Sequence, residues 1–334
     1  MNEKNKWKIL ITGPTICSEA QKILLGNNAE IIFTDNYNSS EKIANLVKKQ
    51  QTDALIVRTG TITREVISSS SNLKVIVKHG TGFNNIDIES ANKLKIPVLI
   101  TPKANLESVA EHAVALIYVL SKKIILHNYE IKINHVWDRN KHQSEELFQK
   151  TIGIIGAGRI GLRVIELISP LNMNIVIYDP FTSEKDLPHC VKKVKSLKEL
   201  LKISDIVSVH CPLNKNTYHL LGKEEFSIMK PSSYLINTSR GGIVDEEALI
   251  LALEEGIISG AGIDVFEKEP PLFTNKIFKL SNIVTTPHTA GPTKEAFVKM
   301  GIAAAKLAIM ILEGKVNEIE KIAFVNPHIL NDFR

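Results

Sequence analysis

Three charged or titratable side chains follow candidate β-strands in the second half of the chain. They are Arg240 in Asn-Thr-Ser-Arg-Gly-Gly, Glu269 in Asp-Val-Phe-Glu-Lys-Glu-Pro and His288 in Thr-Thr-Pro-His-Thr-Ala-Gly. Hydride transfer to a 2-oxo acid requires a cation that binds the carboxylate and polarises the carbonyl, and an acid that protonates the forming alkoxide. Arg240 suits the first task and His288 the second, and a carboxylate at Glu269 would orient the imidazole and favour its protonated form. Each of the three could instead be a surface charge or a helix cap.

A glycine-rich segment predicts a dinucleotide site. The strand candidate at 152–155 runs into Gly156-Ala157-Gly158-Arg159-Ile160-Gly161 and then a helical pattern, and Asp179 ends the next strand candidate. Gly156 would allow the tight turn, Gly158 the approach of a pyrophosphate, and Gly161 close packing of helix on strand. Asp179 would accept hydrogen bonds from ribose hydroxyls and repel a 2′-phosphate, so the expected cofactor is NAD rather than NADP. The alternative is a cluster of turn glycines without a ligand.

These residues require elements that place them at one edge of a sheet. Short β-branched runs alternate with helical patterns and predict a first parallel series at 8–12, 31–34, 54–57, 74–78 and 97–100. A second series begins at Thr151, and its strand candidates are 152–155, 174–178, 205–209, 234–237, 260–264 and 283–286. This is a six-strand doubly wound pattern, and ligands bind such sheets at the carboxyl ends of the strands. Arg240, Glu269 and His288 are therefore expected to converge there.

Between the two series, residues 107–120 predict a long helix that is apolar nearly all round. One sheet face cannot cover so much apolar surface, so we expect burial on two sides and a homodimer built on this helix. The following stretch, 135–150, is polar and irregular, and is expected to be a surface connection.

Composition narrows the class of protein. The chain has 334 residues with 44% hydrophobic and 23% charged residues, which indicates about two ordinary globular domains. The net charge of +5 comes without a run of consecutive basic residues, so a nucleic-acid partner is not expected. The run at 9–11 is too short for a signal peptide, and the longest apolar stretch, 113–120, falls short of the roughly 20 residues that span a bilayer. We expect neither a leader nor a membrane partner.

Cysteine and histidine usage argues against a disulfide framework and a metal site. Cys17, Cys190 and Cys211 are odd in number and far apart, which favours a reducing compartment, the cytoplasm. His79, His112, His210 and Cys211 do not combine into metal-ligand spacings with a third partner, so packing is the expected role and no metal is predicted.

Several ordered motifs resemble those of the D-isomer-specific 2-hydroxyacid dehydrogenases. They are the segments 78–87 and 108–112, the glycine loop through Asp179, and the segments 210–213 and 237–245. The resemblance covers nearly the whole chain and departs at Asn84, where Asp is usual. It implies an α/β fold in which a Rossmann-type doubly wound nucleotide domain, 104–289, is inserted into a flavodoxin-like substrate-binding domain made of 1–103 and 290–334.

The resemblance also implies roles for individual residues. Arg240, Glu269 and His288 are the implied catalytic set. The implied substrate-binding residues are Arg58, Lys78, Thr81, Gly82 and Arg240, with the N–H groups of Thr81 and Gly82 on the substrate carboxylate. The implied cofactor-binding residues are Gly156, Gly158, Arg159, Ile160, Gly161, Asp179, Pro212, Thr217, Thr238, Ser239, Asp264 and Gly291, with Asp264 on the nicotinamide amide.

The particular substrate depends on two cations. Arg58 and Lys78 fall where phosphoglycerate dehydrogenases of this family place cations near the substrate phosphate, although Arg is usual at the second position. We expect D-3-phosphoglycerate oxidation in serine biosynthesis, by a short form without a regulatory domain. If the two residues are solvated strand-end charges, hydroxypyruvate or glyoxylate reduction is the alternative. A rival class is an NAD-sensing binding protein, because the same fold serves transcriptional corepressors. Formate dehydrogenase is disfavoured because it lacks a Glu at the position of Glu269.

Overall fold

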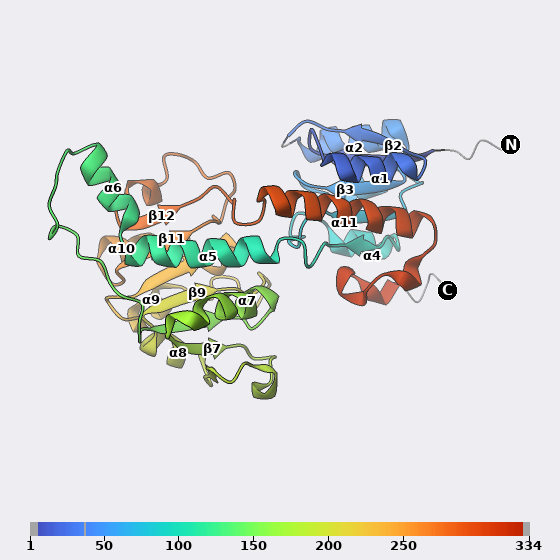
Figure 1. Cartoon of the computed structure of the whole chain (residues 1–334). Helices are drawn as coiled ribbons and strands as arrows, with labels where there is room; N and C mark the ends of the chain where they lie inside the picture. Colours follow the sequence, from blue (N-terminus) through green and yellow to red (C-terminus); the bar gives the residue numbers. More distant parts are fainter. Residues whose placement is uncertain (1–5, 37, 330–334) are drawn as a thin grey trace. The chain divides into compact units, whose positions relative to one another are not determined.

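Runs of β-branched and other apolar residues build two parallel sheets, each with helices on both faces (Figure 1). The computed structural model describes residues 6–36 and 38–329. The chain divides into two units: unit 1 is Met1–Asn105 with Pro292–Arg334, and unit 2 is Leu106–Gly291. Unit 2 thus occupies the sequence between the two segments of unit 1. The α/β fold class predicted from the sequence is confirmed.

The sheet of unit 1 has the strand order β2-β1-β3-β4-β5, which is the flavodoxin-like arrangement. Its strands are β1 (Trp7–Thr12), β2 (Ala29–Phe33), β3 (Ala54–Val57), β4 (Val75–Lys78) and β5 (Val98–Leu99). Its helices are α1 (Ser18–Gly26), α2 (Ser40–Gln50), α3 (Arg64–Ser68), α4 (Ile88–Lys93) and α11 (Lys294–Leu312), with short 3₁₀ turns at Val316–Glu318 and Lys321–Ala323.

Both faces of this sheet are buried. In β1, Ile9 and Ile11 belong to the core that α1 and α11 cover, whereas Leu10 belongs to the core under α2, α3 and α4. This alternation follows from the two-residue period of a strand. Residues after α11 complete the edge, because the side-chain oxygen of Asn326 accepts the N–H of Val98 at 2.8 Å. The second segment of unit 1 is therefore part of its core and of its sheet edge.

The sheet of unit 2 has the order β12-β11-β10-β9-β6-β7-β8. Its strands are β6 (Thr151–Ile155), β7 (Asn174–Tyr178), β8 (Val191–Lys193), β9 (Ile206–Val209), β10 (Tyr234–Asn237), β11 (Gly260–Ile263) and β12 (Ile283–Thr285). The predicted count of six strands is wrong, because β8 is a seventh. It has three residues, two of them Lys, and lies at the edge beside β7, so it needs no apolar run.

The helices of unit 2 cover both faces of its sheet. They are α5 (Leu106–Ser121), α6 (Ile124–Lys132), α7 (Arg159–Ile168), α8 (Leu197–Ile203), α9 (Lys223–Ile228) and α10 (Glu246–Glu254), with 3₁₀ turns at Ser169–Leu171, Glu184–Asp186, Gly241–Ile243 and Lys276–Lys279. α5 and α7 share one core, and α8, α9 and α10 share the other. No helix of the described residues is long and apolar enough to cross a membrane.

The sequence did not predict α6. Lys123, with φ of 51°, ends the regular geometry of α5, and a new helix begins at Ile124. α6 and the irregular segment after it project from the side of unit 2 (Figure 1). The apolar residues Val109, Leu116 and Ile117 of α5 are buried within unit 2, so much of the apolar circumference is covered without a second chain.

Candidate active site

The strand order of unit 2 reverses direction at β6. From β6 the chain proceeds to β7 and β8 on one side and then to β9, β10, β11 and β12 on the other. In an open parallel sheet, the carboxyl ends of the strands beside such a switch point form a ligand site. The predicted glycine loop follows β6, and Arg240, Glu269 and His288 follow β10, β11 and β12, so all lie on this edge.

The glycine loop has the geometry of a close turn from β6 into α7. Gly156 has φ of 101°, and a Cβ there would lie 2.8 Å from the backbone N of Cys211. A Cβ on Gly161 would lie 2.2 Å from the carbonyl oxygen of Gly156, so this glycine lets α7 approach the strand. Gly158, by contrast, has open space around it, and the first N–H groups of α7 lack intrahelical partners. An anion therefore fits at this helix end.

Asp179 ends β7 beside this loop. One carboxylate oxygen accepts the N–H of Ala157 at 2.7 Å, and the other accepts the N–H groups of Phe181 at 2.8 Å and Thr182 at 3.0 Å. Burial alone would raise the pKa of Asp179, but these three N–H groups outweigh it and the pKa is lowered. The group is a fixed carboxylate, and its remaining lone pairs are available to ribose hydroxyls.

His288 and Glu269 form a direct pair. The imidazole Nδ1 lies 2.6 Å from Oε2 of Glu269, while Oε1 of Glu269 accepts the N–H of Phe266 at 3.1 Å. Burial raises the pKa of Glu269, but the bond from His288, its charge, and the Phe266 N–H produce a net lowering. The side chain of His288 is 46% exposed, so its other nitrogen, Nε2, is left for a ligand. This is the arrangement of an imidazole acid-base that a carboxylate orients.

Arg240 is the third member of this group. Its guanidinium donates to the carbonyl of Ser239 at 2.6 Å, and its own carbonyl accepts the side-chain amide of Asn237 at 3.0 Å. Burial lowers the pKa of Arg240, and the nearby charge of Glu269 opposes that effect. The structure thus places a partly desolvated cation close to the His288 and Glu269 pair, all within unit 2.

Asp264 has a different environment from the one expected. Its carboxylate is buried and accepts the Thr286 hydroxyl at 2.5 Å and the N–H groups of Thr289 at 2.7 Å and Ala290 at 2.9 Å. Its carbonyl accepts the N–H of His288 at 2.8 Å. Asp264 therefore fixes the loop that carries His288. The Nε2 of His112 also contacts the Thr286 hydroxyl at 3.0 Å, a link between α5 and this loop that sequence reasoning missed.

The remaining expected cofactor residues lie in the loops after β9 and β10 and at the end of unit 2. Thr217 donates its hydroxyl to the carbonyl of Pro212 at 2.6 Å, and Ser239 donates its hydroxyl to the carbonyl of Cys211 at 2.6 Å. The Thr238 hydroxyl oxygen is buried and has no hydrogen-bond partner among the described residues. Arg159 and Ile160 begin α7, and Gly291 is the last residue of unit 2.

In unit 1, Thr81 and Gly82 follow β4 in a turn. Gly80, with φ of 131°, donates its N–H to the Thr101 hydroxyl oxygen at 2.9 Å and thereby fixes the start of the turn. Among the described residues, neither the N–H of Thr81 nor that of Gly82 has an acceptor. Two successive N–H groups without partners form a small anion-binding concavity.

The structure does not bring Arg58 and Lys78 together as a pair of cations. Val57 of β3 lies opposite Lys78 of β4, so Arg58 is beside His79 instead. The Nζ of Lys78 contacts the side-chain oxygen of Asn85 at 3.2 Å and the carbonyl of Arg58 at 3.3 Å. Because consecutive strand residues face opposite sides, the neighbour of the Arg58 side chain is His79. The sequence suggested only a packing role for that histidine.

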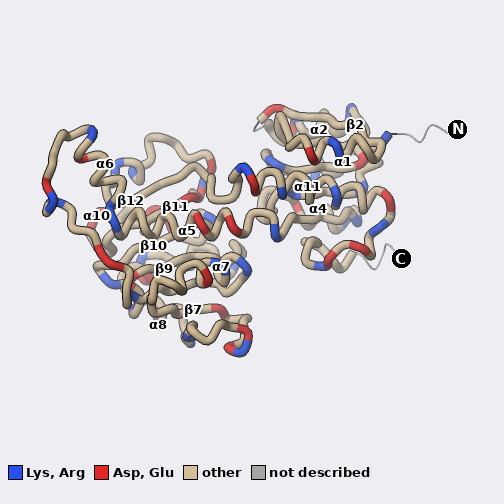
Figure 2. The backbone as a smooth tube through the Cα atoms, viewed as in Figure 1, with Lys and Arg blue, Asp and Glu red and all other residues tan. Residues whose placement is uncertain are grey.

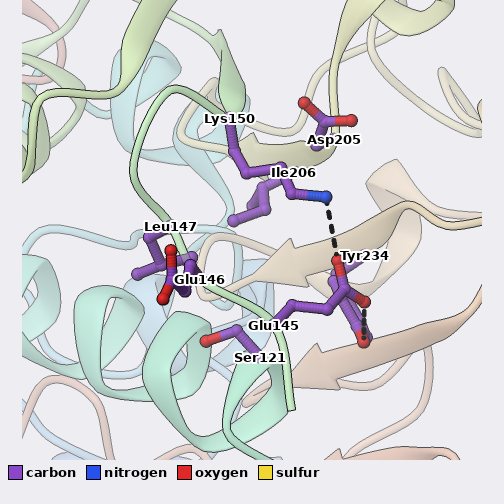
Figure 3. Close-up of a pocket in the computed structure, with 8 residues that line it drawn as sticks. All are labelled: Ser121, Glu145, Glu146, Leu147, Lys150, Asp205, Ile206 and Tyr234. Carbon is purple, nitrogen blue, oxygen red and sulfur yellow. Dashed lines mark hydrogen bonds and ion pairs between the residues drawn. The ribbon is translucent and has the colours of Figure 1, made fainter. Parts of the chain in front are cut away.

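Two other polar clusters do not have the features of an active site. One cavity is lined by Glu145, Lys150, Asp205 and Tyr234, near the amino ends of β6, β9 and β10, away from the ligand edge. In Figure 3, Lys150 and Tyr234 both point to Glu145, at 3.1 Å and 3.0 Å, so these groups are paired with one another.

The second cluster consists of His219, Asp245 and Glu267, whose ligand atoms lie within 4.8 Å of one another. His219 Nε2 lies 2.7 Å from Glu267, which is a direct hydrogen bond. Charged residues of both signs are interspersed along each unit (Figure 2).

Two parallel doubly wound sheets, one with a glycine loop and a histidine-carboxylate pair at its ligand edge, define a protein of the dinucleotide-dependent dehydrogenase class. The sequence model described as "D-isomer specific 2-hydroxyacid dehydrogenase, NAD binding domain" matches residues 114–290, more than half of the chain.

The chain is 38% identical to D-3-phosphoglycerate dehydrogenase of Archaeoglobus fulgidus over 92% of this chain and 58% of that protein. It is 36% identical to hydroxypyruvate reductase of Thermotoga maritima over 89% of this chain and 95% of that protein. The crystal structure of D-lactate dehydrogenase from Aquifex aeolicus, complexed with NAD and lactic acid, superposes with a TM-score of 0.83. It is 32% identical and covers 95% of this chain and 98% of that one.

The chain therefore belongs to the D-isomer-specific 2-hydroxyacid dehydrogenase family and contains its NAD-binding domain. It spans about three fifths of the length of the phosphoglycerate dehydrogenases of Archaeoglobus fulgidus and Methanocaldococcus jannaschii, 58% and 62%.

Proposed function

We propose that this chain is an NAD-dependent D-2-hydroxyacid dehydrogenase whose substrate pair is D-3-phosphoglycerate and 3-phosphohydroxypyruvate, in the cytoplasm and in serine biosynthesis. The observation that carries the activity is the 2.6 Å contact between His288 and Glu269, with Arg240 close by at the edge that holds the glycine loop. The free thiols of Cys17, Cys190 and Cys211 support a reducing compartment.

Each residue of this group has a chemical role in the proposal. In the reductive direction, the His288 imidazole gives its Nε2 proton to the oxygen of the carbonyl that becomes the alcohol, and takes it back in oxidation. Glu269 holds the ring through Nδ1 and stabilises its charged form. Arg240 binds the substrate carboxylate and polarises the carbonyl, while the N–H groups of Thr81 and Gly82 hold the other carboxylate oxygen. NAD supplies or accepts the hydride when it is bound.

The cofactor preference follows from Asp179 and the helix end. The residues fit a dinucleotide, since the open space at Gly158 admits a pyrophosphate and the amide N–H groups of α7 face it. A 2′-phosphate would meet the fixed negative charge of Asp179, so NAD is preferred over NADP. Asp264, in this proposal, acts mainly by fixing the loop of His288.

A second candidate is hydroxypyruvate or glyoxylate reduction. It is favoured by the Thermotoga maritima reductase, because this chain spans 95% of that protein. The distinguishing feature of the substrates is the phosphate. The test is NADH oxidation, followed by absorbance, with 3-phosphohydroxypyruvate, hydroxypyruvate and glyoxylate at equal concentrations. A higher kcat/KM for the phosphorylated acid supports the first proposal, and a higher value for either other acid supports the second. An inactive protein that still binds NADH would support the NAD-sensing alternative.

We further propose a homodimer, formed through α6 rather than through α5. α6 and the segment after it expose Ile125, Ile131, Ile133 and Trp137, which are 55%, 51%, 59% and 82% exposed. Contiguous apolar side chains of this size are rarely left in water. Within the arm, the buried Glu130 accepts Lys141 at 2.9 Å and Asn134 at 3.1 Å, so the segment is held in a fixed shape.

Light scattering is expected to give about twice the chain mass of 37.1 kDa. Ile131→Glu should give the monomer mass, whereas the matched control Leu94→Glu, at an exposed Leu of unit 1, should not change it. A monomeric wild type at micromolar concentration would contradict this proposal.

A further inference from the structure

Arg58 and His79 are neighbours at the carboxyl edge of the unit 1 sheet, the residues that directly follow β3 and β4. Both pack against the ring of Phe297 in α11. The guanidinium carbon of Arg58 lies 5.1 Å from the ring centroid, and the imidazole centroid of His79 lies 5.4 Å from it. One aromatic ring thus fixes two polar groups side by side at the edge where parallel sheets bind ligands.

The guanidinium of Arg58 is a half-buried cation without a carboxylate partner among the described residues. It donates to the carbonyl of Thr15, and its planar fork has further N–H donors. Burial lowers the pKa of Arg58 from its usual value. A charge that has lost water without gaining a counter-ion attracts an anion from solution.

The imidazole of His79 has a buried polar atom to satisfy. The residue is only 9% exposed, and its Nε2 has no hydrogen-bond partner in the described part of the chain. Burial, with the charges of Arg58 and Lys78, lowers the pKa of His79 to about 4, so the ring is neutral near pH 7. A neutral ring can donate one N–H in a fixed direction. Buried polar groups in native proteins nearly always have partners, so an unpaired one beside a cation calls for a ligand atom.

We propose that His79 is a specificity-determining residue that binds, together with Arg58, the anionic group at the end of the substrate away from the reacting carbon. The inference rests on the proposed function and names the residue that selects among its substrates. Arg58 supplies the charge and His79 supplies a directional N–H, and an oxygen of the anion takes the position that Nε2 lacks. A phosphate, whose oxygens point in several directions, can accept from both at once.

Selectivity follows from what a smaller substrate leaves behind. Hydroxypyruvate has a hydroxyl group where 3-phosphohydroxypyruvate has a phosphate, so it would leave Arg58 without an anion and Nε2 of His79 unpaired. A site with buried polar groups rejects an analogue that leaves them unpaired more strongly than an apolar pocket rejects a missing methylene. His79 and Arg58 should therefore affect the phosphorylated substrate and not its unphosphorylated analogue.

The experiment compares kcat/KM for NADH-dependent reduction of 3-phosphohydroxypyruvate and hydroxypyruvate in the wild type, His79→Leu and His79→Gln. We expect His79→Leu to lower kcat/KM for the phosphorylated acid by about 10-fold to 100-fold, the loss of one hydrogen bond to a charged group. Reduction of hydroxypyruvate should change by less than about threefold. His79→Gln keeps an amide donor and should lose less than His79→Leu.

Arg58→Gln should show the same selectivity, and the double variant should lose less than the product of the single losses, because both residues bind one group. The matched control is Arg64→Gln, at an exposed Arg that begins α3, which should leave both substrates unaffected. Melting temperatures identify any variant that does not fold, and His79→Gln then carries the test.

Equal losses on both substrates, or no loss on either, would overturn the inference, since His79 would then only pack the edge of the sheet. A wild type that reduces hydroxypyruvate but not the phosphorylated acid would overturn it as well. A wild type that reduces no 2-oxo acid with NADH would instead refute the proposed function. The two failures are therefore distinguishable.

Discussion

Gly241 provides the sharpest steric test of the proposed catalytic group. A Cβ at this position would lie 2.0 Å from both the carbonyl carbon and the carbonyl oxygen of Phe266. Ordinary contact begins near 3.4 Å, so Gly241→Ala must displace one of the two backbones by about 1.4 Å (3.4 − 2.0). The Phe266 N–H binds Glu269 at 3.1 Å, and Glu269 in turn binds His288 at 2.6 Å. The displacement is therefore transmitted directly to the acid-base pair.

A misplacement of about 1 Å in a catalytic group costs on the order of 10²-fold in rate, or about 2.7 kcal/mol. We expect Gly241→Ala to lower kcat for the best 2-oxo acid by this factor. Affinity for NADH, measured by fluorescence titration, should change little, because the glycine loop at Gly156 is not displaced. Overpacking should also lower the free energy of unfolding by about 1 to 3 kcal/mol.

The adjacent Gly242 offers a matched control. A Cβ there would lie 3.4 Å from a methyl group of Leu213 and 3.6 Å from the ring of Tyr218, which is ordinary contact. Gly242→Ala should keep kcat within about twofold, since no atom has to move. If Gly241→Ala keeps its kcat, or if both variants lose it equally, the proposed transmission through Phe266 is wrong.

Three further predictions concern single side chains. Asp179→Ala should weaken NAD binding and relax discrimination against NADP, and unchanged relative affinities in fluorescence titrations would remove Asp179 from the cofactor site. His288→Ala should lower turnover by about 10²-fold to 10⁴-fold with NAD affinity nearly intact, and a turnover comparable to that of the wild type would exclude the acid-base role. Because the pKa of His79 is lowered to about 4 in the fold, the unfolded chain binds a proton there first, so stability falls as pH drops from about 6.5 to 4. Urea unfolding should show a loss of up to about 3 kcal/mol over this window that His79→Gln reduces, and an equal pH slope in both proteins would contradict the assignment.

Local patterns were enough to predict most of the fold. Strands such as β3 and β10 are buried on both faces, so their apolar runs are visible without any tertiary information. β8 was missed because an edge strand with two Lys has no such pattern. The helix α6 was missed because its start depends on one residue, Lys123, that adopts a left-handed conformation.

The site was predictable only where the motif itself fixes the geometry. The glycine loop and Asp179 lie within one βαβ unit, and the structure places them in contact through Ala157. The contact between Glu269 and His288 could be expected from their positions after β11 and β12. The pairing of Arg58 with His79 could not, because it depends on the register of β3 on β4 and on Phe297, a residue from the other segment of unit 1.

The divided sequence of unit 1 sets an order for synthesis of the protein on the ribosome. Unit 2 is continuous, so its core can close as soon as Gly291 has left the exit tunnel. Unit 1 cannot close then, because α11 contributes Ala304, Ala305 and Ala308 to the core on one face of its sheet. Until α11 emerges, the apolar face formed by residues such as Ile9 and Ile11 is exposed to water and to other nascent chains. The unit made first is thus the last to fold, and the interval is set by the time needed to translate unit 2.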